Sequence, residues 1–165
     1  MIIQLRIDDR LLHGQVAMIW GKELRTKGIV IANDNAAGNE AASVALKMAC
    51  PSDQKLLIKS VEDAKRVIND PRGSGMRILG IVSCVRDALR LVEACPGSIQ
   101  EVNLANAGRF DGIPMDQKRK VTASVFLSED EVAAAKELAD KDVPTFCQVA
   151  PNEAKTNLSK LVAEL

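Results

Sequence analysis

Short apolar runs alternate along the chain with longer stretches in which apolar residues recur every three or four positions. Seven such runs lie at residues 2–7, 28–32, 56–58, 77–82, 99–105, 121–127 and 143–149. Apolar runs of this length that are bounded by turn residues are typical of buried strands, whereas the longer periodic stretches predict helices with one buried face. The pattern therefore predicts an α/β protein.

The stretches between the predicted strands carry helix signals. Val16, Ile19, Trp20 and Leu24 share one face of a helix that Gly28 would end, and we expect that face to be buried. Further helices are expected at residues 40–50, 60–69 and 85–92, another from residue 128 onward, and a last one at 153–165. A polar turn is expected at residues 33–35.

Strands that alternate with helices in this way form a largely parallel sheet, because each crossover returns the chain to the same end of the sheet. We expect a single open, mostly parallel seven-stranded sheet with helices on both faces, and one domain over residues 1–165. In such sheets the site lies outside the carboxyl ends of the strands. The polar segments expected at that edge are residues 8–13, 33–35, 83–84 and 103–109.

Composition narrows the classes of function. The 22 basic residues balance 22 acidic residues and only 2% of the residues are aromatic, so neither a basic field nor stacking platforms for nucleic acid are expected. The apolar runs are far shorter than the roughly 18 residues of a membrane span, and the sequence starts in a strand pattern rather than a leader pattern. We therefore expect a cytoplasmic protein.

The cysteines give no metal or disulfide signal. Cys50, Cys84, Cys95 and Cys147 form neither a CxxC pair nor a zinc spacing, and a domain of this size needs no disulfides. We expect reduced, mostly buried thiols, no bound metal and no other cofactor.

The only histidine, His13, lies in the polar segment between the first predicted strand and the first predicted helix. The first backbone N–H groups of a helix lack intrahelical partners and attract anions, so the amides near Gly14 and Gln15 could bind phosphate. Neutral imidazole is a competent nucleophile toward a phosphoryl group. Arg10, three residues earlier, could place a guanidinium beside that group.

Two acids and a glycine complete this candidate site. Either Asp8 or Asp9 could orient Arg10 or bond one ring nitrogen of His13, which would select the nitrogen that reacts. The sequence leaves both acids open. Gly14 lacks a side chain, which would let a partner's phosphohistidine or a sugar hydroxyl approach closely.

Spacing alone also allows a plainer interpretation. His13 could be an ordinary helix-entry residue, with Asp8 and Asp9 only capping nearby amides. Arg109 is more typical of a surface loop than of a phosphate ligand, and Phe110 is expected in the core.

The segment RIDDRLLHGQV at residues 6–16 resembles the N-terminal signature of the IIB components of the mannose/fructose/sorbose family of the sugar phosphotransferase system. The resemblance extends along nearly the whole chain, through the turn at residues 33–34 and the segments 60–64, 69–71 and 102–104. It includes the phosphorylated histidine of the family, so its specificity is high.

The resemblance implies that His13 accepts a phosphoryl group from a phosphohistidine of the IIA component and passes it to a sugar brought by the membrane components IIC and IID. Arg10 matches the arginine beside the active histidine of the family, and Asp9 matches the neighbouring acid. The resemblance further implies a seven-stranded, mostly parallel sheet with one antiparallel strand, and it places the histidine on an exposed loop after the first strand. It also implies a protein that is peripherally associated with the membrane transporter. The sequence does not identify the sugar.

One segment departs from the family pattern. The loop after the fifth strand commonly reads Asn-x-Gly in the family, whereas this chain has Asn103-Leu104-Ala105. The departure predicts a different backbone shape in that loop and does not touch His13.

Three other classes of protein share features with this sequence. Asp8 and Asp9 also resemble the acidic metal pocket of receiver-type signalling domains, but residues 58–60 lack the acceptor aspartate and residues 103–106 lack the expected lysine. A nucleotide-binding module is disfavoured because neither GxGxxG nor a Walker lysine motif is present. A family member that only regulates or binds, without sugar transfer, stays open as the alternative.

Overall fold

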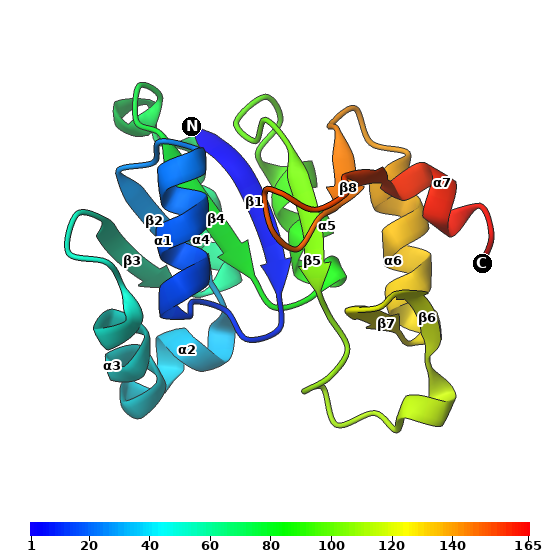
Figure 1. The fold of residues 1–165 in the computed structure, drawn as a ribbon. Coiled ribbons are helices and arrows are strands. Elements are labelled where there is room, and N and C mark those ends of the chain that lie inside the picture. The colour runs from blue at the N-terminus through cyan, green and yellow to red at the C-terminus, as the bar shows by residue number, and fades with distance from the viewer.

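A sheet of seven strands, in the order β3-β2-β4-β1-β5-β8-β9, organises residues 1–165 of the computed structural model (Figure 1). The strands are β1 (Ile2–Asp8), β2 (Gly28–Ala32), β3 (Lys55–Lys59), β4 (Ile78–Val82), β5 (Val102–Asn106), β8 (Thr145–Cys147) and β9 (Thr156–Asn157). Neighbouring strands run parallel except β8 and β9, which are antiparallel. The expected open, mostly parallel sheet with one antiparallel strand is confirmed.

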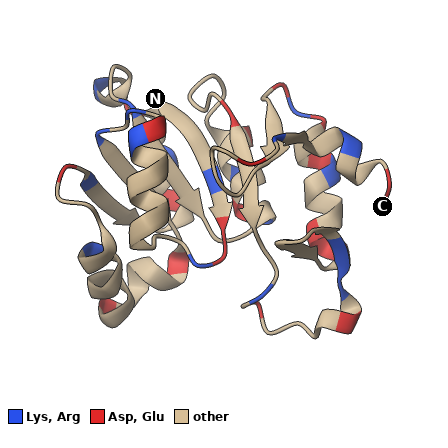
Figure 2. Cartoon of the chain, viewed as in Figure 1, with Lys and Arg blue, Asp and Glu red and all other residues tan.

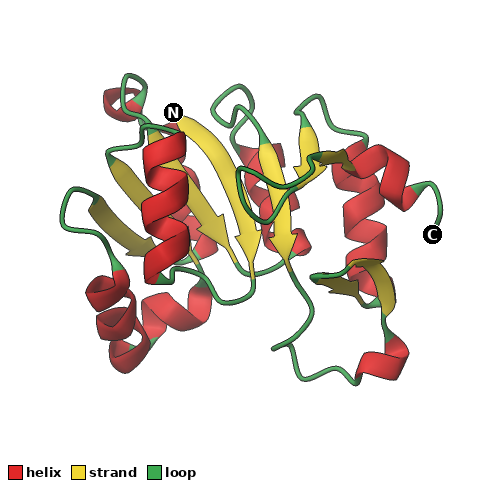
Figure 3. Cartoon of the chain, in the orientation of Figure 1, coloured by secondary structure: helices red, strands yellow, loops and turns green.

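Helices cover both faces of the sheet (Figure 3). One face carries α1 (Gly14–Glu23), α2 (Asp34–Gly38) and α3 (Glu40–Ala49). The other carries α4 (Val61–Asn69), α5 (Val85–Ala94) and α6 (Glu129–Ala139), and α7 (Leu158–Val162) packs against α6. Short 3-10 turns occur at Pro71–Gly73 and Met115–Gln117. None of the helices combines the length and the apolar composition that crossing a membrane requires.

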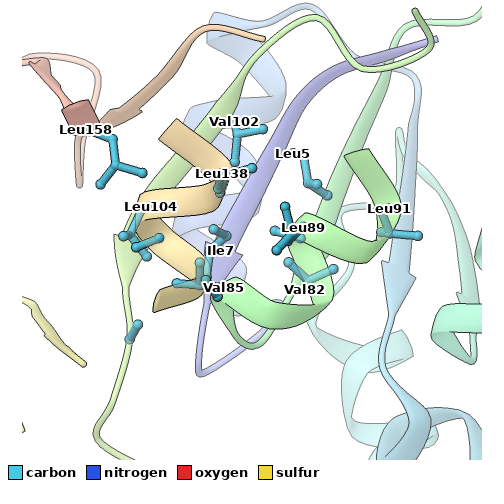
Figure 4. Close-up of a cluster of buried hydrophobic side chains, with 14 of the residues drawn as sticks. Leu5, Ile7, Val82, Val85, Leu89, Leu91, Val102, Leu104, Leu138 and Leu158 are labelled. Atoms are coloured by element: carbon cyan, nitrogen blue, oxygen red, sulfur yellow. The ribbon is translucent and has the colours of Figure 1, made fainter. Parts of the chain in front are cut away.

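Apolar side chains fill one core on each face, because alternate residues of a strand point to opposite sides. The larger core lies between the sheet and α4, α5 and α6, and the close-up in Figure 4 draws part of it. Its labelled members are Leu5, Ile7, Val82, Val85, Leu89, Leu91, Val102, Leu104, Leu138 and Leu158. The smaller core lies under α1 and α3 and includes Trp20, Ile29 and Ile81. All four cysteines are free thiols; Cys95 and Cys147 are buried, whereas Cys50 and Cys84 are only half-buried.

The central strand β1 is buried along its whole length although polar residues alternate with apolar ones. Leu5 and Ile7 enter the larger core, so Gln4, Arg6 and Asp8 point to the opposite face, under α1. Buried polar groups are costly unless they find partners. This row of polar side chains therefore predicts a buried hydrogen-bonded network that ends where β1 ends.

Two element predictions in the second half of the chain were wrong. Residues 121–127 do not add a strand to the main sheet; they belong to a separate hairpin of β6 (Arg119–Thr122) and β7 (Val125–Leu127). The turn forms because Ser124 donates its backbone N–H to Thr122 Oγ1 and its hydroxyl to the Ala105 carbonyl. The expected helix over residues 153–165 covers only Leu158–Val162, because β9 pairs with β8 and Asn157 then caps the helix start.

Other corrections are local. Ile19 and Phe110, expected in the core, are 49% and 66% exposed, because α1 buries the stripe of Ala17, Trp20 and Gly21 and Phe110 lies beyond β5. Residues 33–35 are a helix start rather than a turn, since the Asn33 side chain accepts the N–H of the third residue on and thereby caps α2.

Candidate functional site

The carboxyl ends of the parallel strands bring the predicted polar segments together. After β2 and β4, Asn33 Nδ2 donates to Ser83 Oγ at 3.0 Å. At the ends of β1 and β5, Asn106 Nδ2 donates to Asp8 Oδ2 at 3.1 Å. Figure 2 shows a basic segment within β1 and acidic and basic segments at its carboxyl end. The expectation that these loops share one edge of the sheet is confirmed.

A tight turn after β1 returns the chain toward the strand and places His13. The Leu11 N–H donates to the Asp8 carbonyl at 2.9 Å, and Leu11 has a φ of 57°, in the left-handed region that side chains other than glycine rarely adopt. His13 then stands at the N-cap of α1 with extended backbone, φ −134° and ψ 143°. Strain of this kind clusters at functional sites when surrounding contacts hold it.

The two ring nitrogens of His13 have different surroundings. Nε2 is enclosed, makes no hydrogen bond and lies 3.6 Å from Asp8 Oδ2. The side chain as a whole is 34% exposed, and Nδ1, which also makes no hydrogen bond, is the nitrogen open to solvent. A proton on Nε2 faces a carboxylate, so this tautomer leaves the lone pair of Nδ1 directed outward.

Asp8 is the centre of a buried network. Its Oδ2 accepts from Arg6 Nε at 3.2 Å and lies 3.1 Å from Arg6 Nη2, and both side chains are fully buried. Its Oδ1 accepts the backbone N–H of Arg10 at 3.1 Å. Burial lowers the pKa of the Arg6 guanidinium from its ordinary value, and the neighbouring Asp8 carboxylate opposes that effect. The ion pair therefore places a carboxylate that is held by Arg6 behind the histidine.

The guanidinium of Arg6 is held from its other side as well. Arg6 Nη1 donates to the Val149 carbonyl at 3.3 Å, and Trp20 Nε1 donates to the same carbonyl at 3.1 Å. The guanidinium carbon lies 5.5 Å from the centroid of the Trp20 ring. Sequence reasoning missed Arg6; the signal available was a basic residue at an alternate position of the first predicted strand, between the apolar residues Leu5 and Ile7.

The start of α1 offers free hydrogen-bond donors beside His13. The backbone N–H groups of Gly14, Gln15 and Val16 make no hydrogen bond, no acidic residue occupies the first turn, and His13 gives no side-chain cap. A Cβ added at Gly14 would meet nothing nearer than the Ala49 carbonyl at 4.0 Å, so open space lies beside this position. The arrangement can accept an anion bonded to the outward ring nitrogen.

Asp9 and Arg10 lie apart from the Asp8 network. Asp9 Oδ2 accepts the backbone N–H of Arg109 at 2.9 Å, and its Oδ1 is enclosed without a partner. The side chain of Arg10 is exposed and makes no ion pair or hydrogen bond. The structure thus brings Asp8 to His13 and Asp9 to the loop after β5. The two acids bond different partners rather than forming one acidic pocket of the receiver type.

The expectation that residues 103–105 form the loop after the fifth strand was wrong. Residues 103–105 lie inside β5 and are buried, so they form no loop. The loop begins at Asn106-Ala107-Gly108, which has the Asn-x-Gly spacing. Gly108 has a φ of 89°, and a Cβ there would lie 1.7 Å from the Phe126 carbonyl oxygen, so only glycine fits this backbone.

A cavity of about 310 Å³ opens between Asp9 and the starts of α5 and α6. Glu131 closes one side of it and accepts the backbone N–H groups of Val85 at 2.8 Å and Arg86 at 3.3 Å, which caps α5. Burial raises the pKa of Glu131, and burial beside Glu131 raises the pKa of Cys84 to about 12. The Cys84 thiol therefore stays protonated, which makes it a poor nucleophile.

Comparison with known proteins identifies the family. The family described as PTS system sorbose subfamily IIB component matches residues 2–165. A probable phosphotransferase enzyme IIB component of Streptococcus pyogenes serotype M6 is 49% identical over 163 residues, which cover 98% of this chain and 99% of that protein. The mannose-specific EIIAB component of Escherichia coli strain K12 is 28% identical over 166 residues, covering 100% of this chain and 50% of that protein.

A solved structure agrees with these relatives. The crystal structure of the IIBSor domain of the sorbose permease from Klebsiella pneumoniae matches with a TM-score of 0.87 at 26% identity, and the match covers 99% of this chain and 96% of that one. Fold and sequence together define a IIB component of a sugar phosphotransferase system, a class of phosphotransferases. Within that class, the chain belongs to the sorbose subfamily of IIB components.

Proposed function

We propose that His13 is the phosphoryl carrier of this IIB component: it accepts a phosphoryl group from a phosphohistidine of the IIA component and passes it to a sugar. The observation that carries the proposal is the asymmetry of the imidazole. Nε2 is enclosed 3.6 Å from the buried Asp8 carboxylate, and Nδ1 faces outward beside the free amides of α1. A phosphoryl acceptor needs such a lone pair together with donors for the phosphate oxygens.

The first transfer follows from that geometry. The lone pair of Nδ1 attacks phosphorus, the P–N bond of the donor phosphohistidine breaks, and its electron pair returns to the donor nitrogen. Nε2 keeps its proton throughout, so the ring of phosphorylated His13 carries a positive charge that the Asp8 carboxylate stabilises. The N–H groups of Gly14 and Gln15 bind the phosphoryl oxygens, and the Arg10 guanidinium offsets their charge.

The second transfer uses the same atoms in the opposite sense. A sugar hydroxyl oxygen attacks phosphorus, the P–N bond to His13 breaks, and its electron pair returns to Nδ1. The hydroxyl proton leaves to a base at the acceptor site. Asp9 acts indirectly, because its carboxylate accepts the Arg109 N–H and so holds the loop after β5. No metal or cofactor is required, because histidine, amides and guanidinium supply nucleophile and charge.

The partners proposed are the IIA component and the membrane components IIC and IID, with the protein in the cytoplasm and peripherally associated with the transporter. The Escherichia coli relative carries A and B in one name and one chain, which supports a IIA partner. Met18 and Ile19 on α1 are 62% and 49% exposed, and Phe110 after β5 is 66% exposed. Exposed apolar side chains on α1 and on the loop after β5 are typical of a docking face.

Phosphorylation with purified components tests the proposal. The protein is incubated with phosphoenolpyruvate, the general phosphotransferase proteins and a IIA partner, and the product is treated with acid or base and mapped by mass spectrometry. Because His13 is the only histidine, an acid-labile, base-stable phosphate on this chain supports the assignment. The variant His13→Gln should take up none. No phosphate on wild-type protein with active partners contradicts it.

Transfer of the phosphoryl group to the sugar is tested in a second experiment. Phosphorylated protein is added to vesicles that contain IIC and IID, and sugar phosphate is measured. Loss of phosphate from His13 together with formation of sugar phosphate supports the complete proposal. A stable phosphoprotein with active vesicles and no sugar phosphate would instead favour the regulatory alternative.

A further inference from the structure

Arg109 is a second arginine at the edge of the sheet where His13 lies, and its charge is not neutralised. Four arginines make no ion pair with a carboxylate: Arg10, Arg25, Arg77 and Arg109. Of these, Arg10 follows β1 and Arg109 follows the neighbouring strand β5. The buried guanidinium of Arg6, in contrast, is paired with Asp8 and also donates to the Val149 carbonyl. The arginines available to a phosphoryl group here are therefore Arg10 and Arg109.

The side chain of Arg109 is connected to the histidine through only two residues. Arg109 Nη2 donates to Asn106 Oδ1 at 3.0 Å, and Asn106 Nδ2 donates to Asp8 Oδ2 at 3.1 Å. The same Asp8 oxygen lies 3.6 Å from His13 Nε2. One of the five N–H donors of the guanidinium is used, and its partner is a neutral amide. The remaining donors and the full charge stay free.

The backbone that carries Arg109 is firmly anchored. Ala107 makes two backbone hydrogen bonds with the β6–β7 hairpin. Its N–H donates to the Ser124 carbonyl at 3.1 Å, and its carbonyl accepts the Phe126 N–H at 2.9 Å. Asp9 Oδ2 accepts the Arg109 N–H at 2.9 Å, so the residue that follows Asp8 positions the start of this loop directly. An arginine that binds a phosphoryl group needs an anchored backbone and a side chain with free donors, and Arg109 has both.

We propose that Arg109 is a catalytic residue that binds the phosphoryl oxygens on His13 together with Arg10, and that Asp9 and Asn106 are its positioning residues. The inference rests on the proposed function and deepens it. In the resting site the guanidinium stays on Asn106, and rotation of its side chain brings it to the phosphoryl group. Two guanidiniums then share the charge that the transferred group carries between donor, His13 and acceptor.

The test compares Arg109→Gln and Arg109→Lys with Arg77→Gln. Arg77 is a matched control because its guanidinium also bonds only a neutral acceptor, the Leu24 carbonyl, on a different part of the surface. Each protein is phosphorylated with excess IIA, phosphoenolpyruvate and the general proteins. The rate of transfer from IIA and the pH titration of the phosphoryl ³¹P signal are then measured.

Loss of Arg109 should slow transfer by about tenfold or more and raise the pH at which the phosphoryl group takes up its proton, because a bound guanidinium favours the dianion. Arg109→Lys should restore part of both effects, and Arg77→Gln should change neither. An Arg109→Gln protein with the wild-type rate and the wild-type ³¹P titration overturns the inference. Wild-type protein without phosphate on His13 would overturn the proposed function itself. This result can be distinguished from failure of the Arg109 inference, in which His13 is still phosphorylated.

A second variant covers the case in which Arg109→Gln does not fold. Asp9→Ala removes the anchor of the Arg109 N–H and keeps the guanidinium. It should shift the ³¹P titration in the same direction, and Asp9→Asn, which keeps an acceptor oxygen, should shift it less. A normal titration in Asp9→Ala would show that Asp9 does not position Arg109.

Discussion

Nε2 of His13 lies 3.6 Å from Oδ2 of Asp8, with the histidine one third exposed and the aspartate fully buried. The relationship joins the surface, where a partner can reach Nδ1, to the polar row inside β1. It assigns different tasks to the two acids that follow each other in the sequence. Asp8 faces the imidazole, and Asp9 holds the loop after β5.

Asp8→Asn tests the first of these tasks. The amide keeps the shape of the carboxylate but removes the charge that favours a proton on Nε2 of His13. We expect transfer from IIA to slow by roughly 10–100-fold, the usual cost of losing a residue that orients a functional histidine. The ring ¹⁵N signals of His13 should show a larger share of the tautomer protonated at Nδ1. Unchanged tautomer populations would contradict the role of Asp8.

Arg6→Met tests the ion pair behind the histidine. It leaves Asp8 buried without its counter-charge, which typically costs about 3–5 kcal/mol in the free energy of unfolding. Arg66→Met is the control, because Arg66 is 83% exposed and its ion pair with Asp63 spans 3.8 Å. That surface substitution should cost less than about 1 kcal/mol. Equal losses of unfolding free energy in the two variants, measured by chemical denaturation, would contradict a larger contribution from the buried ion pair.

Gly108→Ala tests the shape of the loop after β5. Its φ of 89° strains any other residue, and the added Cβ would lie 1.7 Å from the Phe126 carbonyl. Gly112 has a φ of 77° but no heavy atom within 4 Å of the added Cβ, so Gly112→Ala isolates the strain alone. We expect a loss of roughly 1–2 kcal/mol for Gly112→Ala and a distinctly larger loss for Gly108→Ala. Similar losses in thermal unfolding would contradict the close contact with Phe126.

Glu131→Gln tests the half-buried carboxyl that caps α5. Burial raises the pKa of Glu131, so the folded state binds this proton more tightly than the unfolded chain. The contribution of Glu131 to stability is therefore greatest at low pH and falls as the pH rises from roughly 4 through the raised pKa.

Denaturation of wild type and Glu131→Gln at pH 4 and pH 7 measures that change. The stability of the wild type relative to the variant should fall between the two values. Glu129→Gln controls for the loss of one charge, because Glu129 is exposed in the first turn of α6, the helix that also carries Glu131. A relative stability that rises with pH would mean that the two amide hydrogen bonds outweigh burial.

The sequence was sufficient for the architecture because β2 and β4 are continuous apolar runs and β1 alternates apolar with polar residues, and both patterns are typical of strands. β1, β2 and β4 were predicted within a residue or two, and the parallel order then placed their polar ends on one edge. Predictions failed where apolar alternation continued through a turn, at Ser124, and where a short antiparallel strand, β9, depended on its partner β8. Neither the turn at Ser124 nor the short strand β9 has a strong local signal in the sequence.

The site was predicted in part. Spacing and resemblance selected His13, and the amides after it are free as expected. Which acid faces the ring could not be predicted, since Asp8 and Asp9 are neighbours and only the pleat of β1 and the turn at Leu11 decide it. Asn106 contacts Asp8 only because β5 is brought beside β1. Arg6 and Asp8 are two residues apart on the same face of β1, so their contact is local.

The most direct test of the central claim is the ³¹P–¹⁵N NMR spectrum of the phosphorylated protein labelled at its single histidine. We predict that phosphorus couples to Nδ1 and that Nε2 keeps its proton beside Asp8. Coupling of phosphorus to Nε2 would contradict the account, because that nitrogen is the enclosed one that faces the carboxylate.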